Sequence, residues 1–235
     1  MCEDFTSRHV VVTGGTGSLG KAVVGRLVKG GATCHVPCYR PEELESFDLR
    51  DHERVSVSQG IDFADESVAQ KYYGGLPGLW ASIHCTGGFS MSELAQTSLD
   101  DFQSQMMLNA VTCFLCCREA VKRMREGEDG GRLVNVAARP ALEPRSGAGM
   151  AAYTAAKSVV AALTQSLGEE LASERIWVNA VAPSIMDTPA NRRSMPEADY
   201  NMWPTVNDVA RTITFLASPD NKSTRGAVVP VYGRS

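Results

Sequence analysis

The chain has 235 residues, of which 43% are hydrophobic and 21% charged, and its formal net charge at pH 7 is −4. This length suits a single α/β domain, residues 1–235, and the composition is ordinary for a soluble globular protein. The weakly acidic charge excludes the basic surface that nucleic-acid binding needs, and no apolar run reaches the roughly 18 residues that span a bilayer. We therefore expect neither nucleic acid nor a membrane as a partner.

The first predicted strand, residues 9–14, runs directly into a glycine-rich turn and a helix at 19–30. The turn, TGGTGSLG, has the spacing G-x-G-x-x-G between a strand and a helix. Glycines there let the backbone approach a pyrophosphate, and the free N–H groups of the helix N-terminus favour the anion. A glycine-rich turn without a ligand is the alternative. The pattern predicts a dinucleotide site formed by Gly14, Thr16, Gly17, Ser18, Leu19 and Gly20.

The end of the second predicted strand, residues 33–38, bears on the choice between NAD and NADP. NAD binding would call for an acidic side chain there, to bind the adenosine ribose. The chain instead continues as Cys38, Tyr39 and Arg40, with glutamates only at 42 and 43. Because arginine pairs well with a 2′-phosphate, Arg40 favours NADP over NAD. A solvated surface arginine is the alternative.

Strands and helices alternate along the rest of the chain. Strands are predicted at 54–59, 79–87, 132–137, 176–183 and 227–233, and helices at 65–73, 99–126, 150–173 and 207–217. The strands are almost continuously apolar, as strands covered on both faces should be. Ser98 is a good N-cap for the helix at 99, with Asp100 and Asp101 in its first turn. The alternation predicts a single Rossmann-type, doubly wound parallel sheet of about seven strands with helices on both faces.

Residues 186–204, MDTPANRRSMPEADYNMWP, interrupt this alternation. Three prolines and a mixture of charged and aromatic residues exclude a long regular element. Loops of this length in compact domains are usually lids or binding loops. Met195, Tyr200, Met202 and Trp203 are too apolar for a purely solvated linker, so we expect a substrate loop rather than disorder.

Seven cysteines stand at positions 2, 34, 38, 85, 113, 116 and 117. An odd number, in a chain whose first residues are acidic and unlike a signal peptide, predicts reduced thiols and a cytoplasmic protein. The stretch CFLCC contains a C-x-x-C, but it lies in a helical pattern and no second Cys/His pair completes a metal site. We expect these cysteines to pack in the core, and we expect no metal.

Tyr153 and Lys157 lie one turn apart in the alanine-rich helix at 150–173. A lysine ammonium near a phenol favours the phenolate, so we expect Lys157 to lower the pKa of Tyr153 from its ordinary value near 10. Tyr153 would then be a general acid for an atom that has just received hydride. A chance pair on an exposed face is the alternative, which the upstream glycine-rich turn disfavours.

The ordered motifs TGGTGSLG, GID (60–62), HCTGG (84–88), Asn109, YTAAK and VNAVAPSIMDTP resemble those of the short-chain dehydrogenase/reductase family, from about residue 9 to 233. The resemblance implies an NAD(P)-dependent oxidoreductase with Tyr153 as catalytic acid/base. It implies that Lys157 binds the nicotinamide ribose and tunes Tyr153, and that Asn109 holds a relay water. Further implied cofactor contacts are Asp62 at the adenine amine, Gly87 under the cofactor, and Pro183 and Thr188 at the nicotinamide amide. Asn109 as an ordinary polar helix residue and Asp62 as a strand-end cap are the alternatives.

The chain departs from the family pattern where a serine usually follows the fifth strand, because Ala138 stands there. Arg139, Ser146 and Thr86 are candidate replacement donors. Smaller departures are Ser18 in the glycine-rich turn, the absence of an asparagine from HCTGG, and Ser184 after Pro183.

Within the family, dihydropteridine reductases also have the alanine, a Gly-Gly pair after the fourth strand and a loop similar to DTPANRRSMPEADYNMW. Their quinonoid acceptor spreads charge through a conjugated ring and needs less help from a hydroxyl donor. We therefore expect a conjugated carbonyl or imine-type acceptor, with a pteridine-like molecule as one candidate and Phe89, Met91 and Trp203 lining its site. Those enzymes use NADH and have an aspartate after the second strand, which this chain lacks.

Two other functions are compatible with the sequence. A catalytically weak dinucleotide-binding sensor would explain the missing serine, and a nucleotide-sugar epimerase would use the same turn and Tyr/Lys pair. Epimerases usually carry a larger C-terminal substrate domain, but only about 50 residues follow Pro183 here. The apolar faces of the helices at 99–126 and 150–173, together with the family resemblance, suggest a homodimer or homotetramer.

Overall fold

The computed structural model describes residues 3–235 and contains one sheet of seven parallel strands in the order β3-β2-β1-β4-β5-β6-β7. The chain builds outward from β1 to β3 and then returns to place β4 beside β1. This reversal creates a crevice at the carboxyl ends of β1 and β4, where doubly wound sheets bind ligands. The strands are β1 (His9–Thr13), β2 (Thr33–Cys38), β3 (Val55–Gln59), β4 (Ala81–His84), β5 (Gly131–Val136), β6 (Ile176–Pro183) and β7 (Val228–Val231).

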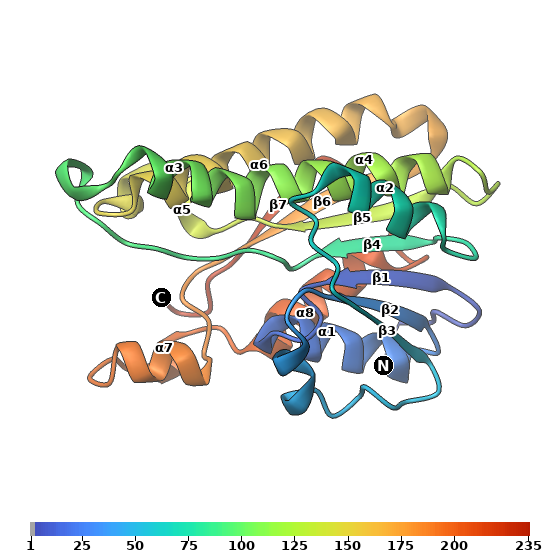
Figure 1. Cartoon of the computed structure of the whole chain (residues 1–235), viewed down its shortest axis with the longest axis horizontal. Coiled ribbons are helices and arrows are strands. Elements are labelled where there is room, and N and C mark those ends of the chain that lie inside the picture. The colour runs from blue at the N-terminus through green and yellow to red at the C-terminus, as the bar shows by residue number, and fades with distance from the viewer. Residues whose placement is uncertain (1–2) are drawn as a thin grey trace.

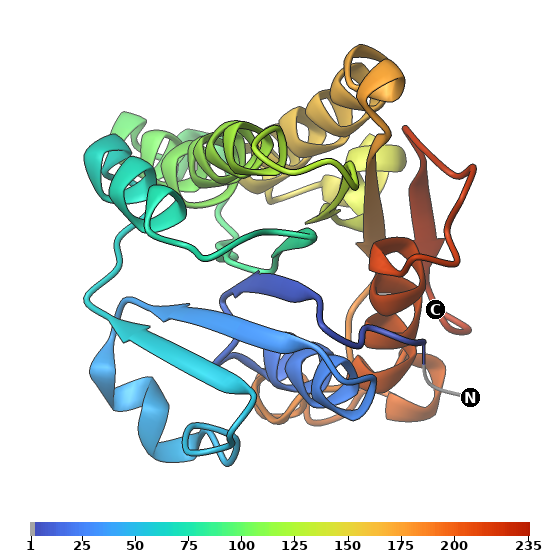
Figure 2. The same ribbon diagram turned by 90° about the vertical axis from the view of Figure 1, so that its right-hand side faces the viewer.

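Helices cover both faces of the sheet, as the alternating pattern predicts (Figures 1 and 2). Helices α1 (Ser18–Lys29) and α8 (Val206–Ala217) pack on one face, and α2 (Glu66–Gly74), α4 (Thr112–Met124) and α6 (Ala151–Glu170) on the other. Successive residues of β1 divide between the two layers, because strand side chains alternate: Val10 and Val12 enter the α1/α8 core and Val11 enters the other. The predicted fold class is confirmed.

The helix predicted at 99–126 is present but not uniform. It consists of α3 (Leu99–Gln105), a π-helical turn η3 (Met106–Val111) and α4. The predicted cap is confirmed: the Ser98 hydroxyl accepts a hydrogen bond from the N–H of Asp101, and the Asp101 carboxylate accepts one from the N–H of Ser98. A π turn inside a helix often marks a functional position, and this one contains Asn109.

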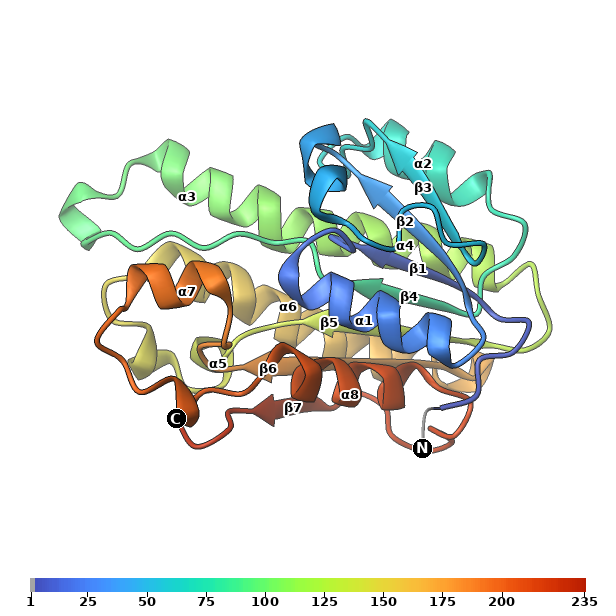
Figure 3. The same ribbon diagram turned by 90° about the horizontal axis from the view of Figure 1, so that it is seen from below.

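Several short helices have no counterpart among the predicted elements, because one or two turns leave too little periodicity to detect. They are η1 (Pro41–Ser46), η2 (Leu94–Gln96), α5 (Arg139–Leu142), η4 (Pro144–Gly147), η5 (Ala172–Glu174), α7 (Pro189–Ser194) and η6 (Tyr200–Met202). Helices α7 and η6 occupy the predicted loop at 186–204, which has no long regular element. Figures 1 and 3 show α3 and α7 beyond the same end of the sheet.

Between residues 3 and 235, no helix combines the length and apolar character that crossing a bilayer demands. The six cysteines within this range are all free, and Cys2 lies outside the described residues. Cys113, Cys116 and Cys117 are buried in the core between the sheet and α4, as expected.

Candidate active site

The glycine-rich turn packs backbone against backbone. A Cβ atom on Gly20 would lie 2.1 Å from the carbonyl oxygen of Gly14, and Gly14 itself has a positive φ of 63°. The N-terminus of α1 has no side-chain cap, because its N-cap residue is Gly17. Its first N–H groups are therefore available to an anion, and the turn fits the pyrophosphate of a dinucleotide.

The turn meets the chain that leaves β4, which fixes the position of the crevice. A Cβ atom on Gly14 would lie 2.8 Å from the backbone nitrogen of Thr86. One residue further on, a Cβ atom on Gly87 would lie 2.7 Å from Asn109 Oδ1 and 3.2 Å from Lys157 Nζ. The segment after β4 thus connects the phosphate end of the crevice, at Thr86, with the Tyr153–Lys157 end, at Gly87. A side chain at Gly87 would clash with Asn109.

Helix α6 places Tyr153 and Lys157 on one face at the carboxyl end of β5. Lys157 Nζ donates a hydrogen bond to the carbonyl oxygen of Val136 (2.8 Å) and lies 5.9 Å from the centroid of the Tyr153 ring. The ring of Phe89 contacts Tyr153 edge to face, with 5.1 Å between centroids. Tyr153 is half-buried while Phe89 is 61% exposed, so Phe89 presents an aromatic surface to solvent beside the tyrosine.

The expected lowering of the Tyr153 pKa by Lys157 is wrong for this structure. Burial raises the pKa of Tyr153 to about 12, and burial also lowers the pKa of Lys157 to about 8. Desolvation penalises the charged form of both groups, and it is the largest cause of both shifts. Tyr153 is therefore a neutral phenol at neutral pH and holds a proton that it can donate.

Asn109, on the π-helical turn, fastens the Gly87–Gly88 segment. Its Nδ2 donates to the carbonyl oxygen of Gly88 (3.1 Å), and its Oδ1 accepts from the N–H of Gly88 (3.2 Å). Nδ2 also donates to the carbonyl oxygen of Gln105 (3.1 Å). The amide is 1% exposed and is more than an ordinary polar helix residue, because it holds this segment against Lys157.

The remaining expected cofactor residues lie along the same edge of the sheet. Pro183 ends β6, and the Thr188 hydroxyl caps α7 by accepting from the N–H of Asn191 (3.2 Å). Asp62 follows β3 and accepts from the N–H of Ala64 (2.9 Å), so it does act as a local cap. Arg40 is exposed, and within the described chain its side chain makes no hydrogen bond or ion pair.

Glu43 contacts the glycine-rich turn, although in the sequence it lies well beyond the end of β2. The carboxylate of Glu43 accepts a hydrogen bond from the hydroxyl of Thr16 (2.5 Å). Helix η1 folds residues 41–46 back toward the glycine-rich turn, which is why a residue five positions after Cys38 lies there. In the sequence, only the Pro-Glu-Glu stretch at 41–43 indicates that a helical turn begins there.

Nothing in the immediate surroundings replaces the absent serine directly. Ala138 is 5% exposed and forms the N-cap of α5 without a side-chain hydrogen bond. The guanidinium of Arg139 donates to Glu143 (2.8 Å), and the hydroxyl of Ser146 donates to the Glu143 carbonyl (2.8 Å). Thr86 lies beside Gly14, at the phosphate end. Two of the three candidate donors are therefore already engaged.

The expected role of Trp203 in substrate binding also requires correction. The ring is only 8% exposed and packs against Tyr200, with 5.1 Å between ring centroids. A side chain this apolar gains more from packing under the loop than from exposure. Trp203 therefore supports the loop at 186–204, whereas Phe89 and Met91, at 61% and 65% exposure, remain available to a ligand.

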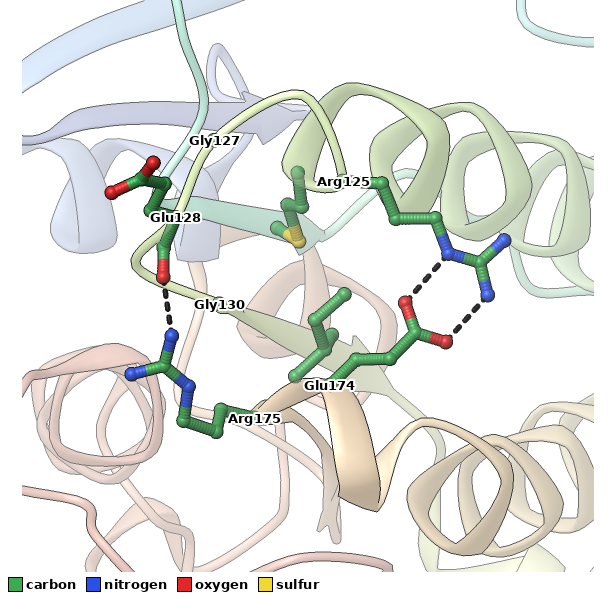
Figure 4. Close-up of a pocket in the computed structure, with 8 residues that line it drawn as sticks. Arg125, Gly127, Glu128, Gly130, Glu174 and Arg175 are labelled. Atoms are coloured by element: carbon green, nitrogen blue, oxygen red, sulfur yellow. Dashed lines mark hydrogen bonds and ion pairs between the residues drawn. The ribbon is translucent and has the colours of Figure 1, made fainter.

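A separate surface pocket of about 470 Å³ lies at the opposite end of the sheet, where β5 and β6 begin. Figure 4 shows Arg125 facing Glu174, and the two side chains form two hydrogen bonds of 2.6 Å. Arg175 donates to the backbone carbonyl of Glu128. Since these charges are already paired within the protein, this pocket is a poor site for a dinucleotide, and the crevice at the carboxyl ends remains the candidate site.

The glycine-rich turn and the Tyr153–Lys157 pair at the switch point of the sheet define a dinucleotide-dependent oxidoreductase. The chain belongs to the short-chain dehydrogenase family: a model of the family described as short chain dehydrogenase matches residues 8–199. It is accordingly an NAD(P)-dependent enzyme acting on a small molecule, and membership of a family of oxidoreductases favours catalysis over the sensor alternative.

Similar proteins match this chain along most of their length. The 3-oxoacyl-[acyl-carrier-protein] reductase FabG of Rickettsia felis is 28% identical, covering 98% of this chain and 97% of its own. A 3beta-hydroxysteroid dehydrogenase of Mediterraneibacter gnavus is 30% identical, covering 84% of this chain and 73% of its own. A glucose/ribitol dehydrogenase of this family from Brucella melitensis has a similar structure, with a TM-score of 0.89, 25% identity and coverage of 99% of this chain and 98% of its own.

The structure of ElxO with NADP bound is also similar, with a TM-score of 0.87, 25% identity and coverage of 96% of this chain and 97% of its own. None of the four proteins named here carries the name of a dihydropteridine reductase.

The charge of Lys157 predicts an alkaline limb in the pH dependence of acceptor reduction. With a pKa of about 8, Lys157 loses its proton as the pH rises through 8, whereas Tyr153, at about 12, keeps its own. The developing phenolate then loses a cation within about 6 Å, so kcat should fall on the order of tenfold. Rates of NAD(P)H oxidation measured from about pH 6 to pH 10 check this. Lys157→Arg stays charged throughout; the same limb in that variant would show that another group titrates.

Proposed function

We propose that this enzyme transfers hydride between a nicotinamide cofactor and a conjugated carbonyl or imine-type acceptor, with Tyr153 as general acid/base. The observation that carries the proposal is Ala138. It stands where a hydroxyl would otherwise stabilise the negative charge that forms on a reduced oxygen, and Arg139 and Ser146 each donate a hydrogen bond to Glu143 instead. An acceptor that delocalises this charge depends less on a local donor.

Bound in the crevice, the nicotinamide would supply or accept the hydride, and the protein would handle the proton. The neutral phenol of Tyr153 donates its proton to the reduced atom, and the ammonium of Lys157, fixed by the Val136 carbonyl, stabilises the phenolate that remains. Asn109 keeps the Gly87–Gly88 segment, and thereby Lys157, in place. A water held by Asn109 for proton relay belongs to the same proposal.

The exposed aromatic surface at the site supports a flat acceptor. Phe89 stands edge to face against Tyr153 and, together with Met91, is largely exposed. A conjugated ring lying against Phe89 would bring its reducible atom toward the Tyr153 hydroxyl and bury apolar surface on both partners. Pteridine-like molecules have this shape and electron demand, and we propose them as one candidate class. The relatives' names include a ketoacyl reductase and a steroid dehydrogenase, so similarity alone does not select the acceptor.

Restoring the hydroxyl should widen the acceptor range. In Ala138→Ser, we expect kcat/KM for unconjugated ketones to rise about 10- to 100-fold, because one added donor at a developing oxyanion has an effect of this order. For quinonoid pterins and quinones the change should be small. Steady-state NAD(P)H oxidation against both groups of acceptors measures the ratio.

The matched control is Ala151→Ser, which adds a hydroxyl at an exposed position at the start of α6. This variant should leave kcat/KM unchanged for both groups of acceptors. An equal response of both groups to Ala138→Ser would argue against the proposed dependence on conjugation.

We propose NADP rather than NAD as the better cofactor, since Arg40 is exposed, lies two residues after β2 and has no side-chain hydrogen bond or ion pair within residues 3–235. Arg40→Ala should weaken NADPH binding about 10- to 100-fold and leave NADH binding nearly unchanged, because a charge-assisted contact to a phosphate is lost. Glu43, beside Thr16, is the opposing charge, and Glu43→Gln should tighten NADPH binding.

Fluorescence titration of each variant with NADPH and NADH measures both effects. Arg50→Ala, which removes an arginine already paired with Asp51, is the control and should bind both cofactors as the wild type does. Equal losses for NADH and NADPH in Arg40→Ala would remove the 2′-phosphate from the explanation.

We also propose that two copies associate through the outer face of α3, η3 and α4. Several large apolar side chains there are each at least 40% exposed, which is costly on a monomer. They are Leu99, Phe102, Met107, Leu108 and Phe114. A homodimer would bury this face, and a homotetramer would need a second interface in addition to it. Light scattering of the purified chain distinguishes the two from a monomer.

A cytoplasmic location is part of the proposal. All six described cysteines are free thiols, which an oxidising compartment would not favour. Subcellular fractionation of the source cells tests it.

A further inference from the structure

Three metal-ligating side chains meet inside the core, and the proposed reaction uses none of them. The donor atoms of His84, Cys113 and Cys117 all lie within 4.8 Å of one another, and all three residues are buried. His84 is the last residue of β4, and the two cysteines are four positions apart on α4, so they lie on the same face of the helix. No second Cys/His pair accompanies CFLCC in the sequence, which predicts no metal site, but the fold supplies the histidine from a different strand.

The imidazole of His84 is oriented as metal-binding histidines are. Its Nδ1 faces the cysteines, 3.6 Å from Cys117 Sγ, and its Nε2 is 2.9 Å from Ser82 Oγ. Ser82 is in turn hydrogen-bonded to the hydroxyl of Tyr73 (2.9 Å). A metal-ligating histidine usually has its second ring nitrogen held in this way, which fixes both the ring and its tautomer.

A fourth donor completes the set. Asn135 Oδ1, from β5, accepts a hydrogen bond from the Cys117 thiol (3.5 Å) and lies at hydrogen-bond distance, 2.8 Å, from His84 Nδ1. The protons in these hydrogen bonds would be released when an ion binds. The amide cannot turn away easily, because its Nδ2 donates to the hydroxyl of Thr164 (2.9 Å). Four donor atoms from three elements thus point at one buried region, and the partners behind His84 and Asn135 hold those two donors in place.

We propose that His84, Cys113, Cys117 and Asn135 form a binding site for one thiophilic divalent cation of the zinc type. Two thiolates would neutralise the charge of the ion, so the loaded site adds no net charge to the core. Tetrahedral zinc, with bonds of about 2.3 Å to sulfur and about 2.0 Å to nitrogen, requires nitrogen–sulfur separations of about 3.5 Å. The His84–Cys117 separation of 3.6 Å already meets this, and the sulfur atoms need to close by about 1 Å at most.

A disulfide between Cys113 and Cys117 is a poor alternative to metal binding. Residues four apart on a helix have Cβ atoms about 5–6 Å apart, whereas a disulfide requires about 3.5–4.5 Å.

The experiment measures metal content in the full-length, untagged chain, since a polyhistidine tag would itself bind metal. Because the site is buried, the ion must enter during folding, so the protein is produced with zinc or cobalt in the growth medium. Elemental analysis should find about one ion per chain, and the cobalt form should show sulfur-to-cobalt charge-transfer and tetrahedral d–d absorption bands. The variant Cys113→Ser/Cys117→Ser should retain less than about a tenth as much metal.

Cys116→Ser is the matched control, because Cys116 is equally buried on the same helix but lies outside the donor set. It should bind metal as the wild type does. If the double variant does not fold, X-ray absorption of the zinc-loaded wild type decides: two sulfur neighbours at about 2.3 Å support the proposal. Metal-free wild-type protein, a sulfur-free coordination shell, or metal retained by the double variant would each overturn it. None of these readouts depends on the acceptor or on the role of Tyr153.

Discussion

Replacing Tyr153 with phenylalanine is expected to lower kcat about 10²- to 10⁴-fold while cofactor affinity stays within a few-fold of the wild type, which is the usual range for loss of a general acid. The substitution removes only the hydroxyl, so the edge-to-face contact with Phe89 and the packing of α6 should persist. Stopped-flow oxidation of NAD(P)H measures the rate, and fluorescence titration measures the affinity.

Tyr39→Phe provides the matched control, because Tyr39 is 58% exposed and follows β2, outside the proposed catalytic machinery. It should turn over as the wild type does. Unchanged turnover in Tyr153→Phe would remove this residue from the mechanism, and loss of cofactor binding would show that the ring, rather than its hydroxyl, had been disturbed.

Gly20→Ala should have the largest effect on cofactor binding. The new Cβ atom would lie 2.1 Å from the Gly14 carbonyl oxygen and 2.6 Å from Gly15 Cα, both of them backbone atoms that cannot rotate away. The turn must therefore shift by about an ångström, and a misplacement of this size costs on the order of 10²-fold in function. We expect NADPH affinity to fall by about that factor, and the free energy of unfolding to fall by about 1–3 kcal/mol.

Gly25→Ala, later in the same helix, is the control that distinguishes an effect on the turn from an effect on the helix. Its Cβ atom would meet only Leu49 Cδ1, at 3.9 Å, which is an ordinary contact. Because alanine favours a helix over glycine, this variant should gain about 0.5–1 kcal/mol and bind NADPH normally. Thermal unfolding measures the stability of both variants, and fluorescence titration measures their affinity for NADPH. Wild-type affinity in Gly20→Ala would mean that the turn does not hold the cofactor.

The parts of the site that are local in the chain were readable from sequence. The glycine-rich turn needs its residues within one strand–turn–helix unit, and Tyr153 and Lys157 need only one turn of helix. Strand–helix alternation likewise predicts a parallel sheet, because parallel strands require crossover connections. The π-helical turn around Asn109 leaves no comparable pattern, since its residues match those of any apolar helix.

Sequence by itself therefore determined the fold class, the place of the dinucleotide turn and the candidate acid, because short-range spacing and periodicity specify them. Only the tertiary structure decided that the pKa of Tyr153 is raised rather than lowered, since desolvation depends on everything packed around the phenol. It also brought Glu43 to the turn, buried Trp203 beneath the loop, and gathered His84 and Asn135 with two cysteines of α4. Those contacts join residues from separate strands and helices, and their distances follow from how the layers pack rather than from any spacing along the chain.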